Sequence, residues 1–170
     1  MLELGNGYLS GMIPSELGVL SSLKYIEIYD NELTGTLPTE FGLLSALIEF
    51  GFDNLPYITG PIPSELGLLV KLETLYVYGN VLMTGAIPTE LGTLKQLEVL
   101  YISNTKFTGQ IPTELGMLSN LEWFLMYDMP ELSGSIPSEL GMLTNVNYLE
   151  ICKYFDTNDF VSSMITFLFI

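Results

Sequence analysis

The sequence predicts a protein of the α/β class that folds as a solenoid, with short repeated units stacked along one parallel sheet. Two observations support this prediction. A Gly-x-Ile/Leu-Pro segment recurs six times with its prolines 24 or 25 residues apart, and a strand-like pattern precedes each copy. A unit of this length cannot bury its leucines alone, so neighbouring units must cover one another. The prolines are Pro14, Pro38, Pro63, Pro88, Pro112 and Pro137.

Each unit begins with a strand. In Tyr25-Ile26-Glu27-Ile28-Tyr29, two isoleucines alternate with polar or aromatic residues, so we expect Ile26 and Ile28 inside and the other three outside. Stacking places these strands in parallel, about 4.8 Å apart. The same frame predicts strands at residues 25–29, 49–52, 74–77, 99–102 and 123–126.

A turn, a glycine–proline segment and a short helix follow each strand. Asn31 and Asn80 occupy the turn, where a side-chain amide can bond open backbone groups. Elsewhere this column holds other residues, and asparagine stands one position earlier at Asn6, Asn54 and Asn104. The glycine of Gly-x-Ile-Pro permits a backbone conformation that other residues resist, and the proline restricts φ. Ser/Thr-Glu-Leu-Gly then predicts one helical turn that the glycine closes.

The repeats fill residues 1–170 as one domain. The first unit starts within its strand, and no basic segment followed by an apolar run opens the chain, so we expect part of a longer protein. The apolar residues 161–170 are too short for a membrane span of roughly 20 residues and are interpreted as a degenerate repeat. The predicted units are a partial unit 1–19, full units 20–43, 44–68, 69–93, 94–117 and 118–142, and a degenerate unit 143–170.

This frame resembles the plant-type leucine-rich repeat, with the consensus L-x-x-L-x-x-L-x-L-x-x-N-x-L-x-G-x-I-P-x-x-L-G, from Leu2 to about Ile151. The resemblance implies a right-handed horseshoe arc with the parallel sheet on the concave side and short 3₁₀ or helical turns on the convex side. Family members are typically ectodomains of receptor-like kinases or receptor-like proteins, or secreted inhibitors of cell-wall hydrolases, which implies an extracellular or cell-surface location. The chain lacks the family's cysteine-paired caps and a kinase domain.

The charge of the chain narrows the class of partner. It contains 20 acidic and 5 basic residues, with a formal net charge of -15. Such a chain repels phosphate backbones, so nucleic acid is not expected as a partner, whereas basic groups are attracted.

We expect neither an enzyme nor a bound cofactor or metal. The chain has no histidine, which rules out Ser-His-Asp and Cys-His pairs and imidazole metal sites. Cys152 has Lys153 beside it, which could lower a thiol pKa, but nothing else supports a nucleophile. One glutamate recurs per unit and is interpreted as a solvated ladder on the convex side, in preference to a carboxylate pair or weak calcium sites. The ladder comprises Glu16, Glu40, Glu65, Glu90, Glu114 and Glu139.

A hydroxyl side chain also recurs once per unit, just before the glycine. Regular threonine rows can bind ice, whereas hydroxyl residues at a strand edge also simply bond backbone. A structural or ice-binding role is therefore the less favoured hypothesis. The column comprises Ser10, Thr34, Thr59, Thr84, Thr108 and Ser133.

Aromatic and acidic residues gather on the outward positions of the predicted strands. Exposed aromatic rings bury a large area at little entropic cost, although tyrosine also has a high strand propensity. We therefore predict a non-catalytic module that recognises a protein or peptide partner carrying basic groups, through stacking, cation–π contacts and charge pairing. The alternative is a cell-surface carbohydrate-binding or hydrolase-inhibiting protein. The candidate residues are Tyr25, Glu27, Tyr29, Asp30, Glu49, Asp53, Tyr76, Tyr78, Tyr101, Trp123, Tyr127, Asp128, Tyr148 and Glu150.

Overall fold

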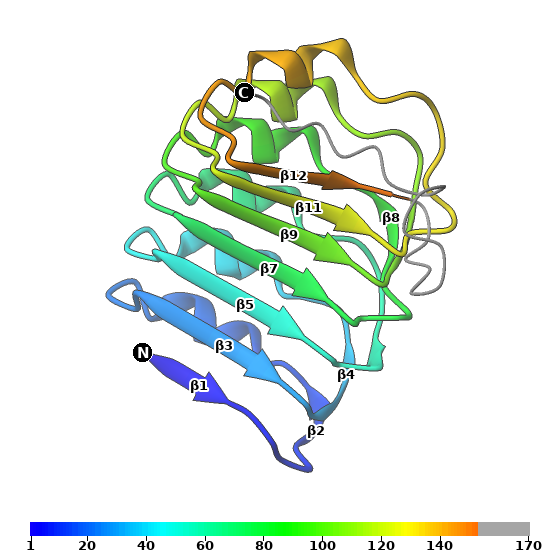
Figure 1. Ribbon diagram of the computed structural model, residues 1–170. Coiled ribbons are helices and arrows are strands. Elements are labelled where there is room, and N and C mark those ends of the chain that lie inside the picture. Colours follow the sequence, from blue (N-terminus) through cyan, green and yellow to red (C-terminus); the bar gives the residue numbers. More distant parts are fainter. Residues whose placement is uncertain (153–170) are drawn as a thin grey trace.

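Seven parallel strands form the main sheet of the computed structural model, which describes residues 1–152 (Figure 1). They lie side by side in chain order, so each coil of the chain adds one strand to the stack. The five predicted strands are confirmed, and four of them extend one residue further than predicted. The strands are β1 (Leu2–Leu4), β3 (Tyr25–Tyr29), β5 (Glu49–Asp53), β7 (Thr74–Tyr78), β9 (Val99–Ser103), β11 (Trp123–Tyr127) and β12 (Tyr148–Ile151). The predicted degenerate repeat at 161–170 lies outside the described residues.

The inward side chains of the main sheet form one continuous core. Ile26 and Ile28 are fully buried, as the alternation predicts, and Phe50 and Phe52 occupy the same inward columns on the next strand. Phe41 from the opposite side of the coil meets the Phe50 ring edge-on, with the ring centroids 5.5 Å apart. The core thus runs the length of the stack, and each coil depends on its neighbours for burial.

A short 3₁₀ helix forms the opposite, convex side of each coil. Each follows directly on a proline, whose φ is between -61° and -66°. The prediction that the glycine closes the helix is wrong, because the glycine lies inside the helix as its fourth residue. A Cβ at Gly92 would lie 2.3 Å from the backbone oxygen of Glu114, so glycine is needed because adjacent coils approach closely. The helices are η1 (Ser15–Val19), η2 (Thr39–Leu43), η3 (Ser64–Leu68), η4 (Thr89–Thr93), η5 (Thr113–Met117) and η6 (Ser138–Met142).

Two small parallel sheets connect the main sheet to the helices. The glycines of the Gly-x-Ile-Pro segments lie here with left-handed backbone angles, for example φ of 85° at Gly35 and 96° at Gly85. One sheet comprises β2 (Ser10–Met12), β4 (Glu32–Gly35) and β6 (Tyr57–Ile58), and the other comprises β8 (Thr84–Ala86) and β10 (Lys106–Thr108).

The turn after each main strand contains two columns with different roles. Asn80 is buried, donates to the Phe52 carbonyl at 2.6 Å and accepts from the Leu55 amide at 3.0 Å, and Asn31 bonds the preceding coil in the same way. The amide role predicted for Asn31 and Asn80 is confirmed. One position earlier, Asn54 and Asn104 have φ of 51° and 50°. They satisfy a different demand, because asparagine tolerates the left-handed conformation better than most residues.

Candidate ligand-binding face

Three columns of outward side chains cross the main sheet, and we call the surface that they form the concave face. Strand register places twelve of the fourteen predicted site residues on these columns, while Asp30 and Asp128 follow directly in left-handed turns with φ of 51°. The first column is Tyr25, Glu49, Thr74, Val99, Trp123 and Tyr148. The second is Glu3, Glu27, Gly51, Tyr76, Tyr101, Leu125 and Glu150. The third is Tyr29, Asp53, Tyr78, Ser103 and Tyr127.

Four tyrosines on β7, β9 and β11 form a cluster of mutually contacting rings. Tyr101 lies at its centre: it stacks on Tyr78 with the ring centroids 5.3 Å apart and an interplanar angle of 8°. It meets Tyr76 edge-on at 6.3 Å and Tyr127 at 5.6 Å, and its hydroxyl bonds that of Tyr127. Burial raises the pKa of the Tyr76, Tyr78 and Tyr127 phenols, so these hydroxyls stay protonated in neutral solution. They can therefore both donate and accept hydrogen bonds.

A second aromatic pair stands beside this cluster. Trp123 stacks on Tyr148 with the ring centroids 5.5 Å apart, and 47% of the Trp123 surface is exposed. Between the pair and the cluster lies a hollow of about 290 Å³. Its lining comprises Tyr76, Val99, Tyr101, Trp123 and Leu125. We call these contacting rings and their hollow the aromatic region.

The strands β3 and β5 carry carboxylates on their outward side, alongside the Tyr25 and Tyr29 rings of β3. Among these carboxylates, Asp53 has the largest pKa shift. Burial, with smaller contributions from the charges of Glu27 and Asp30, raises its pKa to about 6. Burial and the nearby Glu27 also raise the pKa of Glu49. The charges acting on Asp53 and Glu49 are thus of like sign, which a cationic ligand would relieve. We call Glu27, Asp30, Glu49 and Asp53 the acidic region.

Glu150 differs from its predicted role as an accessible ligand contact. Its position on β12 belongs to an outward column, yet it is only 5% exposed. Its carboxylate accepts hydrogen bonds from the Tyr148 hydroxyl at 3.0 Å and from the Cys152 thiol at 4.0 Å. Glu150 therefore holds the Tyr148 hydroxyl in place, and its carboxylate is not accessible to a ligand.

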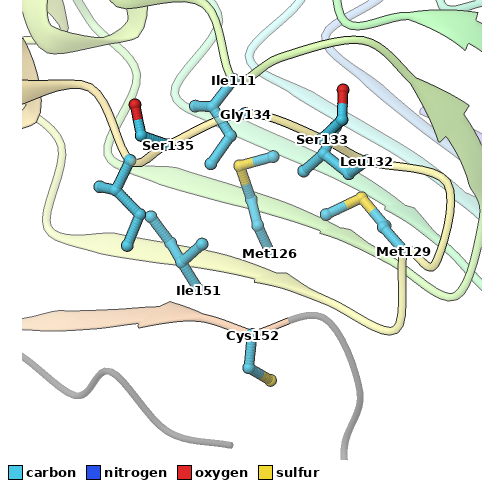
Figure 2. Close-up of a pocket in the computed structure, with 10 residues that line it drawn as sticks. Ile111, Met126, Met129, Leu132, Ser133, Gly134, Ser135, Ile151 and Cys152 are labelled. Carbon is cyan, nitrogen blue, oxygen red and sulfur yellow. The ribbon is translucent and has the colours of Figure 1, made fainter.

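A second hollow of about 230 Å³ lies between the small-sheet side and the end of β12 (Figure 2). It is mainly apolar, and Met126, Met129 and Ile151 are among its lining residues. Cys152 also lines it, but burial, together with the nearby Glu150 and Asp128 charges, raises the thiol pKa to about 11. The thiol is therefore protonated at neutral pH and is a poor nucleophile.

Carboxylates outside the concave face were also candidates for a metal site or for catalysis. Within residues 1–152, no group of three or more cysteine and carboxylate side chains is placed to hold a metal ion. The glutamates of the ladder are the second residues of the convex helices, where each of five accepts a hydroxyl hydrogen bond from the preceding serine or threonine. Sequence reasoning missed Val99 and Leu125 as part of the hollow. The repeat frame places both residues on outward columns, but a single apolar residue at such a position does not by itself indicate a binding site.

The repeat architecture also has counterparts among known proteins. The Leucine Rich Repeat family model matches residues 22–44 and 96–118, and the solved structures described below match 82–90% of the chain. The chain belongs to the plant-type leucine-rich-repeat family. No curated protein matches it in sequence.

Three solved structures that resemble this leucine-rich-repeat solenoid are of plant proteins. The Arabidopsis receptor kinase HAESA, in complex with the peptide hormone IDA and the co-receptor SERK1, is 30% identical with a TM-score of 0.78 over 90% of this chain. The ectodomain of the Arabidopsis thaliana membrane receptor kinase GASSHO1/SCHENGEN3, in complex with CASPARIAN STRIP INTEGRITY FACTOR 2, is 35% identical with a TM-score of 0.67 over 90%. A plant ice-binding protein is 27% identical with a TM-score of 0.72 over 82% of this chain and 44% of its own.

The solenoid spans 25% of the HAESA chain and 21% of the GASSHO1 chain, so it corresponds to a short stretch of those receptors. No helix within residues 1–152 is long and apolar enough to cross a membrane.

Proposed function

We propose that this solenoid is a non-catalytic binding module, whose concave face recognises a protein or peptide partner carrying basic groups, as part of a longer extracellular or cell-surface protein. The observation that carries the proposal is the adjacency of the acidic and aromatic regions on one continuous sheet surface. A ligand crossing the strands would meet carboxylates on β3 and β5 and then rings on β7, β9 and β11.

The chemistry of the two regions supports a ligand with two kinds of side chain. Lysine or arginine would relieve the repulsion among Glu27, Glu49 and Asp53. An apolar, aromatic or cationic side chain would fill the hollow against Tyr76, Tyr101 and Trp123. The peptide-hormone complex of the similar HAESA receptor supports the same partner class.

Selection from a displayed peptide library would test this function. We expect the wild-type protein to enrich peptides that combine basic and aromatic or apolar residues. The double variant Tyr101→Ala/Trp123→Ala should lose these peptides, whereas Tyr57→Ala should retain them. Tyr57 is a suitable control because it is 51% exposed but lies on β6, in a small sheet. Enrichment of acidic peptides, or binding on a glycan array with none in the library, would contradict the proposal and favour the carbohydrate alternative.

Ice binding is a second candidate, favoured by the hydroxyl column and by the similarity to a plant ice-binding protein. All six hydroxyl residues of the column are exposed. However, only four of them lie on strands, and these strands belong to two separate sheets. The hydroxyls of the other two, Thr59 and Ser133, donate to the carbonyls of Gly35 and Gly109. Thermal hysteresis decides this candidate: activity that Thr34→Tyr and Thr108→Tyr abolish would establish ice binding, and a freezing behaviour equal to that of buffer would exclude it.

A further inference from the structure

An exposed apolar side chain stands at the last position of five of the six 3₁₀ helices, on the side of the solenoid opposite the concave face. Val19 is 74% exposed, Leu43 60%, Leu68 63%, Met117 45% and Met142 55%. Thr93 occupies the position in η4. We call this row the convex stripe. The 3₁₀ helices η1 to η6 pack directly against one another in chain order, so the stripe runs along the stack.

The fold gives no reason for apolar residues at these positions. The third residue of the helix supplies the buried side chain, as with Phe41, Leu66 and Leu91, and the glycine after it is buried as well. Thr93 shows that a polar residue suits the fifth position, where its hydroxyl donates to the Gly67 and Glu90 carbonyls. A row of exposed large apolar side chains, interrupted here only at Thr93, is typical of a contact surface.

The glutamate ladder runs directly beside the convex stripe. The glutamate is the second residue of each helix and the stripe residue is the fifth, and side chains three residues apart eclipse one another in a 3₁₀ helix. One carboxylate oxygen of Glu65 and of Glu114 is held by a neighbouring hydroxyl, at 3.4 and 3.2 Å. The ammonium of Lys95 bonds the carbonyls of Gly92 and Met117, so this nearby cation is engaged with the backbone of the helices.

We propose that the convex stripe and the glutamate ladder together dock a basic amphipathic α-helix of a partner protein. Its turns are about 5.4 Å apart, close to the roughly 4.8 Å spacing of stacked strands, so one apolar side chain per turn can contact one coil. Lysine or arginine residues along one flank would then face the ladder. A basic helix is favoured over a second copy of the chain or an anionic membrane. The protein has a net charge of -15, so it would repel either of these negatively charged partners.

A designed helical peptide of about 18 residues, or five turns, provides the probe. It carries leucine at i, i+4, i+7, i+11 and i+14 and lysine along one flank. The control peptide has the same composition in an order without an apolar face. We expect fluorescence anisotropy to show binding of the first peptide at least about tenfold tighter than of the second.

Variants then locate the binding. Leu43→Asn and Leu68→Asn should each weaken the peptide at least about fivefold, and Thr93→Leu should strengthen it, because it completes the stripe. Met12→Asn should leave the affinity unchanged, because Met12 is 71% exposed but lies on β2, away from the convex stripe. Thermal unfolding of each variant checks that the exposed substitutions leave the fold intact.

Three outcomes would overturn the proposal. Equal binding of both peptides, or insensitivity to Leu43→Asn and Leu68→Asn, would mean that charge alone attracts them. A dimer in sedimentation velocity that Leu68→Asn dissolves would make a second copy the occupant. Binding to phosphatidylcholine–phosphatidylserine vesicles that the same variant abolishes would make the occupant a membrane. All of these measurements use the Tyr101→Ala/Trp123→Ala background, which removes two rings that line the concave hollow, so the convex binding is measured apart from the proposed function.

Discussion

Beneath the acidic region and beneath the aromatic region, the coils are built alike. Phe50 under the first and Leu75 and Leu100 under the second occupy one inward column, and all three are fully buried. On the outward side the regions differ: the rings around Tyr101 contact one another, whereas burial and the like charges of Glu27 and Asp30 raise the pKa of Asp53. The outward positions are therefore independent of what the stack needs, and their chemistry is free to serve a ligand.

The largest expected effect comes from the core that both regions share. Leu47 lies in a coil of the acidic region and Leu97 in a coil of the aromatic region, and both are fully buried at equivalent repeat positions. Leu47→Ala and Leu97→Ala should each lower the free energy of unfolding by about 2–5 kcal/mol, because each leaves a cavity between two coils. Denaturant titration measures this quantity. A cost below about 1 kcal/mol for Leu97→Ala would place it outside the core.

The next effect separates the regions by ligand affinity. Tyr101→Ala and Trp123→Ala should each weaken the native partner by about 2 kcal/mol, roughly thirtyfold, because each removes a ring that lines the hollow. Calorimetric titration measures the affinity, and near-unchanged circular dichroism shows that the coil stays folded. If both rings can be removed without loss of affinity, the tyrosines serve the strand alone.

A smaller effect concerns the acidic region and depends on pH. The pKa of Asp53 in the folded protein, about 6, lies above its ordinary value of 3.8, so ionising this carboxyl opposes folding. The opposition is absent below pH 3.8, grows as the pH rises and is complete above about pH 6. Asp53→Asn should therefore unfold at a higher temperature than the wild type at pH 7.5. The difference should vanish at pH 3.5, and a variant less stable at pH 7.5 would contradict this account.

The smallest effect is expected on the convex side. Glu65→Gln removes one charge from the ladder, far from the concave face, and should change the affinity for a concave-face ligand by less than about twofold. The association rate of a basic ligand should fall slightly at low ionic strength and recover with added salt. Stopped-flow measurements at two salt concentrations check this. If this variant lost binding of the ligand, the recognition surface would be the glutamate ladder and not the concave face.

The sequence by itself determined the stack and the composition of its faces. A 24- or 25-residue period and the alternation in segments such as Tyr25–Tyr29 are local features, and they place strands, inward residues and outward columns without knowledge of the rest. The left-handed glycines before each proline follow in the same way, since the requirement lies in one residue's own backbone.

Contacts between coils were decided only by the tertiary structure. Gly92 is confined by the backbone of Glu114 in the next coil, and Tyr101 gathers Tyr78 and Tyr127 from two different neighbours. Glu150 occupies an outward position, yet Tyr148 and Cys152 bond its carboxylate and it is buried. A repeat pattern specifies which column a residue joins. Rotamers, ring contacts and burial depend on what the adjacent coils place beside it, and these are properties of the packed stack.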